Sequence, residues 1–184
     1  MQLSWNYNYG QFSNIFSTRG YDSKMELLED PGKVSRDGYV AMAAGLWFYM
    51  TPQAPKPSMH DVMTGRFIPN NVDLSNNMTN SFATTINIIN GGLECGKGLG
   101  YDKVVKRGEY FNNWLNFFDS PAETDLDCGL QPNYFPAGGA ADNNYYFDQD
   151  WSGSGKCKVV TWPTLYSALA RDDYKRCVCD VWGK

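Results

Sequence analysis

One long apolar segment constrains the fold more than any other part of this chain. From Ser35 to Pro52 the sequence reads SRDGYVAMAAGLWFYMTP, and apolar side chains recur in it every three or four residues. This spacing predicts an α-helix with an apolar stripe. The stripe comprises Tyr39, Met42, Ala43, Leu46, Trp47 and Met50. Ser35 or Asp37 can cap its start and Pro52 ends it, so we expect the central buried helix here.

Similar spacing predicts further helices downstream. In KPSMHDVMTG, Ser58 and Asp61 form a pair like a capping box, and Gly65 is a suitable C-terminal stop. The segment NSFATTINIINGG repeats the pattern and is expected to end at Gly91 and Gly92, and YDKVVKRGEYFNNWLNFF repeats it again. The apolar faces comprise Phe82, Ile86 and Ile89 in the first and Val104, Phe111, Leu115 and Phe118 in the second. The intervening RFIPNNVDLSNN is interpreted as a loop.

Strand signals are few, and the best short candidate is CKVVTW. A late helix is expected to begin near TWPTLYSALA, with a proline in its first turn. The Gly- and Asp-rich stretch PAGGAADNNYYFDQDWSGSG is expected to be a loop that joins the main body to a tail. We therefore predict a mainly α fold with long ordered loops and little strand. Its main body would span residues 1–145 and its tail residues 146–184.

The size and charge of the chain exclude several classes of partner. Its 184 residues suit one domain that can bury an ordinary core. The net charge is −4 and the basic residues are scattered, so we expect no nucleic acid partner. No stretch approaches the roughly 18 uncharged apolar residues that cross a bilayer, so we expect no membrane partner. The start of the chain lacks the basic and apolar regions of a signal peptide.

Cysteine and histidine usage favours disulfides over a metal site. There are five cysteines, none of them in a Cys-x-x-Cys pair, and His60 is the only histidine. A zinc site of the usual type is therefore not expected, and neither is a cofactor; we expect His60 to be structural. Disulfides imply an oxidising compartment. The odd count leaves at least one thiol unpaired or paired elsewhere.

Aromatic rings and amides are abundant and suggest a site for sugars. The chain has 12 tyrosines and 6 tryptophans, and its first ten residues, MQLSWNYNYG, interleave rings with amides. Sugars stack their C–H faces on aromatic planes while their hydroxyls pair with amides and carboxylates. The alternative for any single ring is that it fills the core.

Three segments together carry a family resemblance. MQLSWNYNYG, GLWFYMTPQAPKPSMHDV and TTINIINGGLECGKG occur in this order and resemble the second half of the catalytic domain of family 19 glycoside hydrolases, the chitinases of plants and many bacteria. The resemblance extends over about residues 1 to 145 and leaves the tail unmatched. It implies a lysozyme-like, mainly helical fold of the α+β superfamily. It also implies endo-acting cleavage of β-1,4-linked N-acetylglucosamine polymers, in chitin and cell-wall polysaccharide catabolism, with inversion.

The resemblance assigns the opening segment to the floor of the cleft. Ser4 would hold the nucleophilic water through its hydroxyl, and Gln2, Tyr7 and Asn8 would bind sugar hydroxyls and acetamido groups. The residue types agree in kind, since a small hydroxyl can orient water and an amide both donates and accepts. Without the resemblance, the segment could equally be an N-terminal strand or turn that exposes polar groups.

Two further residues are assigned to sugar binding by the resemblance. The Asn90 amide would contact the substrate near the point of cleavage, although an asparagine before Gly91 and Gly92 is also a common helix end. Lys56 would bind sugar from a loop stiffened by flanking prolines, although an isolated lysine is usually solvated.

The resemblance also assigns a supporting ion pair and a disulfide. Glu94 and Arg107 would sit behind the general acid, tune its pKa and hold its orientation. The alternative is an ordinary ion pair. Cys95 and Cys128 match a family disulfide. For the tail, either Cys177 or Cys179 is the expected partner of Cys157.

The family's two catalytic glutamates lie upstream of the segment that contains Gln2, so we expect this chain to lack them. Met1 could be an internal methionine, the chain could derive from proteolysis or gene splitting, or the protein could be a shortened relative. The partner implied is chitin or a chitooligosaccharide bound by a monomer, in an extracellular protein whose signal peptide is absent from this chain. The alternative function is a non-catalytic chitin- or peptidoglycan-binding module.

Overall fold

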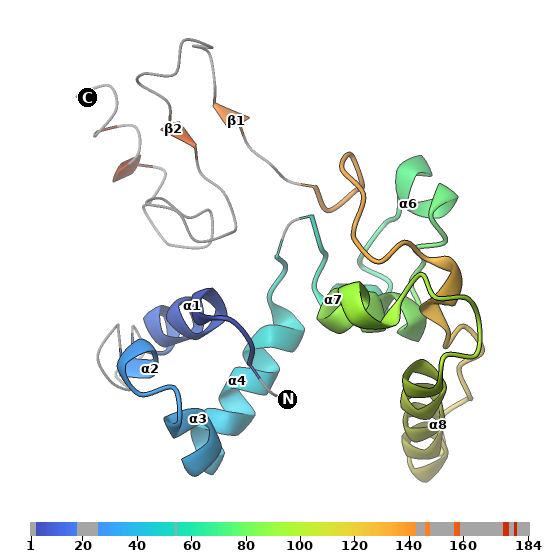
Figure 1. The fold of residues 1–184 in the computed structure, drawn as a ribbon, viewed down its shortest axis with the longest axis horizontal. Helices are drawn as coiled ribbons and strands as arrows, with labels where there is room; N and C mark the ends of the chain where they lie inside the picture. The colour runs from blue at the N-terminus through green and yellow to red at the C-terminus, as the bar shows by residue number, and fades with distance from the viewer. Residues whose placement is uncertain are drawn as a thin grey trace. The chain divides into compact units, whose positions relative to one another are not determined.

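The computed structural model describes residues 3–17, 26–53, 55–142, 146–147, 157–158, 175–176 and 179 (Figure 1). Within them the chain is mainly helical. The helices are α1 Asn6–Ser17, α2 Glu26–Glu29, α3 Lys33–Arg36, α4 Gly38–Met50, α5 Met59–Met63, α6 Asn71–Ser75, α7 Phe82–Glu94, α8 Asp102–Phe117 and the 3₁₀ helix η1 Cys128–Leu130. The strands found in this part of the chain are β1 Tyr146–Phe147 and β2 Cys157–Lys158, which pair antiparallel. The prediction of a mainly α fold is confirmed.

The chain divides into two compact units, which are described separately. The first unit comprises Met1–Thr51 with Tyr145–Lys184, and the second comprises Pro52–Asn144. The tail helix expected near TWPTLYSALA lies outside the described residues, whereas the expected strand is observed at Cys157–Lys158. The proposed boundary between body and tail stays a prediction. None of the described helices is both long and apolar enough to span a membrane.

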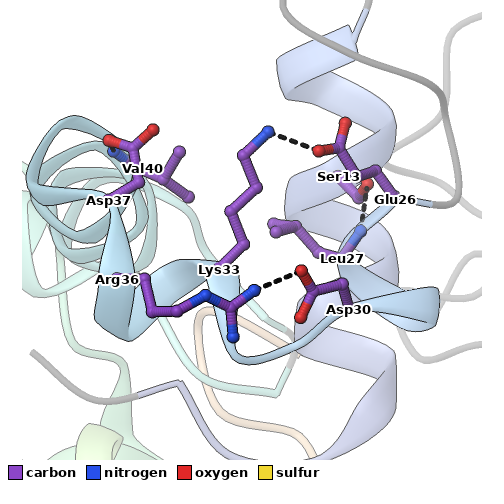
Figure 2. A network of polar contacts seen from close by, with 8 residues as sticks. All are labelled: Ser13, Glu26, Leu27, Asp30, Lys33, Arg36, Asp37 and Val40. Atoms are coloured by element: carbon purple, nitrogen blue, oxygen red, sulfur yellow. Dashed lines mark hydrogen bonds and ion pairs between the residues drawn. The ribbon is translucent and has the colours of Figure 1, made fainter.

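The first unit packs α1 to α4 around one apolar cluster. Its buried members are Leu3, Phe12, Leu27, Val34, Val40, Ala44 and Trp47. The ring centroids of Phe12 and Trp47 lie 5.7 Å apart, so α1 and α4 meet through these aromatic side chains. Figure 2 shows two ion pairs made by α3: Lys33 pairs with Glu26 of α2, and Arg36 pairs with Asp30, the residue that follows α2.

Helix α4 forms where the sequence predicts it, but its burial differs from the expectation. The Asp37 carboxylate caps its start by accepting hydrogen bonds from the backbone N–H groups of Tyr39 and Val40. The buried residues are Val40, Ala44 and Trp47. Most of the predicted stripe, namely Tyr39, Met42, Leu46 and Met50, is 49–66% exposed. The expectation of a central buried helix is therefore wrong for this face, because apolar residues occur on every side of α4 and spacing alone does not select the buried one.

The second unit is organised around α7, which contacts α5, α8 and η1. Ser81 caps α7 by accepting a hydrogen bond from the Thr84 N–H. The core of this unit comprises Ala83, Ile86, Cys95, Val104 and Cys128. Phe82 stacks on Phe111 of α8, with ring centroids 4.1 Å apart. The helices expected in this region are thus confirmed, although Phe118, predicted to face the core, is exposed.

Of two short helices with capped starts, α5 was predicted from the sequence and α6 was not. Helix α5 is capped by the predicted Ser58, whose hydroxyl oxygen accepts a hydrogen bond from the Asp61 N–H at 2.9 Å. Helix α6 lies in the segment interpreted as a loop, so that interpretation is wrong. Its start is fixed by a capping box between Asn70 and Asp73. The Asp73 carboxylate also accepts a hydrogen bond from the Ala140 N–H at 2.8 Å, which ties α6 to a distant segment.

Candidate functional site

The residues assigned to the site fall in both units. Ser4, Tyr7 and Asn8 belong to the first unit. Gln2 and the side chain of Tyr7 lie outside the described part of the chain. The second unit holds the larger set, which comprises Lys56, Asn90, Glu94 and Arg107. Each group is described within its own unit.

The opening segment forms the start of a helix and not the strand or turn that was the alternative. Helix α1 begins at Asn6, and the exposed Ser4 precedes it. The Asn8 amide nitrogen donates a hydrogen bond to the Ser4 carbonyl oxygen at 2.6 Å, and the Tyr9 hydroxyl donates to the Leu3 carbonyl at 3.1 Å. The side chains of Asn8 and Tyr9 therefore hydrogen-bond the backbone just before the helix and fix its start. The Ser4 side chain is exposed at this point.

A buried carboxylate lies at the centre of the second unit's site. Glu94 is 2% exposed. Arg107 donates to it twice, from Nε to Oε2 at 2.6 Å and from Nη2 to Oε1 at 2.9 Å. Asn90 donates from Nδ2 to Oε1 at 2.5 Å. Glu94 thus accepts three hydrogen bonds, two of them from a planar guanidinium whose geometry matches a carboxylate.

The electrostatics of this cluster follow from these contacts. The hydrogen bonds from Arg107 lower the pKa of Glu94, and the one from Asn90 acts in the same direction; burial opposes them but does not outweigh them. The same ion pair raises the pKa of Arg107. Glu94 therefore remains ionised at neutral pH. A carboxylate in this state can orient and polarise neighbouring groups, but it has no proton to give as a general acid.

A kink in α7 places Asn90 against Glu94. The backbone of Asn90 is non-helical, with φ −149° and ψ 29°, and the helix resumes and continues to Glu94. The expected stop at Gly91 and Gly92 is therefore replaced by an interruption one residue earlier. A Cβ atom on Gly91 would lie 2.2 Å from Asn87 Oδ1, so the glycine is required for the close approach of the Asn87 side chain.

Lys56 is anchored on the same helix. Its Nζ donates a hydrogen bond to the Ile88 carbonyl oxygen at 2.8 Å, and its backbone pairs with Gln53. Burial lowers the pKa of Lys56. The structure therefore brings Asn90, Glu94 and Arg107 into one network and holds Lys56 against α7 two residues before the kink.

Two buried amides, Asn87 and Gln131, support this site, and neither of them was predicted from the sequence. Asn87 donates from Nδ2 to the Pro132 carbonyl at 2.7 Å and to Gln131 Oε1 at 3.2 Å. Gln131 donates in turn to Thr84 Oγ1 and to the Asn77 carbonyl. These amides hold the segment after η1 against α7. A polar residue three positions before Asn90, on the apolar face of a helix, was the available signal for Asn87.

Comparison with known proteins identifies the family. The family model for class I chitinases, glycoside hydrolase family 19, matches residues 1–128. The chain belongs to glycoside hydrolase family 19. The resemblance inferred from the sequence is confirmed, and so is the lysozyme-like, mainly helical fold that this family implies. The predicted pairing of Cys95 with Cys128 is observed as a disulfide.

Curated relatives of this family 19 chain include endochitinases and one inactive protein. Endochitinase CH25 of Brassica napus is 37% identical over 80% of this chain, and endochitinase A2 of Pisum sativum is 39% identical over 71%. Inactive chitinase-like protein 1 of Hevea brasiliensis is 40% identical over 70% of this chain. The aligned region spans 42%, 38% and 38% of these relatives respectively.

In the tail, the thiol of Cys179 is free and exposed. Of the two partners expected for Cys157, Cys179 is therefore excluded in this structure. Pairing with Cys177 stays a prediction, because Cys177 lies outside the described residues.

Proposed function

We propose that this chain forms the substrate-binding part of a chitinase-type site and binds β-1,4-linked N-acetylglucosamine polymers. The observation that supports this most directly is the network of Asn90, Glu94 and Arg107. It holds a side-chain amide in a fixed orientation beside a buried ion pair. An amide of this kind can pair with the hydroxyl and acetamido groups of an amino sugar.

Each assigned residue has a role in this proposal. Asn90 contacts the acetamido-bearing sugar, and Glu94 and Arg107 set its orientation and tune a neighbouring general acid. Lys56 and the first unit's Gln2, Tyr7 and Asn8 bind sugar groups, and Ser4 orients the attacking water. Inverting hydrolysis needs two carboxyl groups about 6.5–9.5 Å apart, one of them protonated. The ionised Glu94 does not meet the requirement for the acid, so we assign it to support.

We therefore expect oligosaccharide binding by this chain with little or no hydrolysis. The second candidate, a non-catalytic chitin- or peptidoglycan-binding module, is favoured by the Hevea brasiliensis relative that is named inactive. An extracellular location is part of the proposal, because the Cys95–Cys128 disulfide persists in oxidising compartments. We propose that the chain acts as a monomer.

The test measures binding and turnover separately. Isothermal titration of the purified chain with tetra-N-acetylchitotetraose gives the affinity, and chromatography of the same mixture detects cleavage products. We expect measurable binding that Asn90→Ala weakens by about tenfold, the effect of losing one or two well-placed hydrogen bonds. Asn71→Ala is the matched control, since Asn71 is an exposed asparagine on α6. Absence of binding by the unmodified chain would refute the proposal.

Turnover distinguishes the two candidate functions. Substantial cleavage that Glu94→Gln abolishes would show that Glu94 takes part in the chemistry and would overturn its supporting role. Binding to chitin together with no cleavage favours the non-catalytic module, and preference for peptidoglycan fragments over chitotetraose would identify its ligand.

A further inference from the structure

The second half of α8 exposes aromatic side chains on the face that carries Arg107. Tyr110, Trp114 and Phe117 are 60–70% exposed. They follow Arg107 by three, seven and ten residues, and residues at these intervals lie on one face of an α-helix. This aromatic face is therefore continuous, along one helix of one unit, with the cluster of Asn90, Glu94 and Arg107.

The rings at the end of this face hold one another in place. The rings of Trp114 and Phe118 stack at 6.1 Å with an interplanar angle of 23°. Phe117 meets both of them edge-on, at 5.7 and 5.1 Å. Helix α8 is anchored in the core through Val104 and through the stack of Phe111 on Phe82. The exposed rings thus form a preorganised surface on a fixed helix.

A contiguous exposed aromatic surface requires an explanation that single exposed rings do not. Scattered apolar residues are normal on protein surfaces, whereas contiguous patches mark binding sites. The segment from Tyr110 to Phe118 reads YFNNWLNFF and contains no charged residue. Its exposed polar members are Asn113 and Asn116. Rings beside amides, without charge, match a neutral polymer whose units have C–H faces, hydroxyls and acetamido groups.

The length of this face also suits a polymer. With a rise of about 1.5 Å per residue, Arg107 and Phe117 lie about 15 Å apart along the helix axis. A ring appears at about every helical turn, a spacing close to the length of one sugar unit. Several consecutive sugars of an extended chain can therefore contact the face at once.

We propose that Tyr110, Trp114 and Phe117 form an aromatic track that binds chitin polymer beyond the sugars held at the Asn90 cluster. The assignment of the polymer as chitin rests on the proposed function. The track itself supplies affinity for long chains, because each ring that a sugar covers, by its face or by its edge, removes apolar surface from water, and each added sugar reaches a further ring.

The test compares a polymer with a short ligand. Binding of the chain to insoluble chitin is measured by depletion from solution, and binding of tri-N-acetylchitotriose is measured by calorimetry. In the double variant Trp114→Ala/Phe117→Ala we expect polymer affinity to fall by about tenfold or more, a far larger factor than for the trisaccharide. Ile68→Ala is the control, because Ile68 is 80% exposed in the same unit and is not part of α8. The conservative variant Trp114→Phe should retain most polymer binding.

Each alternative result has a defined meaning. Unchanged polymer binding by the double variant overturns the track and leaves the proposed function standing. Equal losses for both ligands overturn it as well, since they indicate a structural effect. If the unmodified chain binds neither ligand, both proposals fail. Sedimentation velocity provides the remaining check: a dimer that the double variant converts to a monomer would show that a second copy covers this face, which also overturns the track.

Discussion

The Arg107 guanidinium donates two hydrogen bonds to the buried Glu94 carboxylate, from Nε to Oε2 at 2.6 Å and from Nη2 to Oε1 at 2.9 Å. The two partners differ in environment, because the Glu94 side chain is 3% exposed whereas that of Arg107 is 42% exposed. Removing Arg107 would leave a buried charge without its counter-ion. Removing Glu94 leaves a cation that water can still reach.

The two charged hydrogen bonds of this pair predict the stability of variants at Glu94. In Glu94→Gln the amide keeps the shape of the carboxylate but loses its charge, and we expect a loss of about 1.5–3 kcal/mol in the free energy of unfolding. Urea denaturation at neutral pH measures the difference. Glu109→Gln, an exposed glutamate on α8, is the control and should change stability by less than about 0.5 kcal/mol. Equal stability of Glu94→Gln and the unmodified chain would show that the ion pair of Glu94 with Arg107 does not stabilise the fold.

The lowered pKa of Glu94 predicts how the stabilisation depends on pH. The folded-state pKa lies below the ordinary value of about 4.3, so between these two values the unfolded state binds more protons than the folded state. The contribution of Glu94 is therefore complete above the ordinary value and is lost as the pH falls through the folded-state pKa. The stability difference between the unmodified chain and Glu94→Gln should stay constant from pH 7 to 5 and shrink below pH 4, as measured by denaturation at each pH. A difference that grows on acidification would reverse the assigned direction of the shift.

The helices could be predicted from the sequence more reliably than their environment. The caps of α4 at Asp37 and of α5 at Ser58 are local features, because the side chain of one residue contacts the backbone of its near neighbours in the sequence. The buried face of α4 depends on what packs against it, and a helix that is apolar all round does not encode this. The short α6 depends on Asp73, whose carboxylate also binds Ala140, so its stability comes partly from a segment far along the chain.

In the candidate site, too, some contacts could be predicted from the sequence and others depend on tertiary packing. The pairing of Glu94 with Arg107 and of Cys95 with Cys128 followed from the family resemblance, and the structure contains both contacts. The kink at Asn90 did not follow, because it accompanies the packing of the Asn87 amide against Gly91 and Pro132. Propensity rules contain no information on such tertiary contacts.

The disulfide predicts a large stability effect. Cys95 and Cys128 are both buried and are separated by 33 residues. Cross-linking a loop of this length lowers the entropy of the unfolded chain, which raises the free energy of unfolding by about 3–4 kcal/mol in the chain-entropy model. The double variant Cys95→Ala/Cys128→Ala should lose about this amount in urea denaturation. Non-reducing peptide mapping of the unmodified chain checks the pairing independently. A loss below about 1 kcal/mol would show that the loop is already restricted in the unfolded state.

Two adjacent glycines provide a matched test of the kink in α7. A Cβ at Gly91 would lie 2.2 Å from Asn87 Oδ1, whereas a Cβ at Gly92 meets its nearest atom, the Asn133 carbonyl oxygen, at 4.0 Å. We therefore expect Gly91→Ala to destabilise the fold by about 1–3 kcal/mol, because Asn87 must move away from its hydrogen bonds to Pro132 and Gln131. Gly92→Ala should be neutral or slightly stabilising, since alanine favours a helix over glycine. Thermal unfolding of the two variants measures the contrast, and equal midpoints would show that the close approach of Asn87 to Gly91 does not determine the kink.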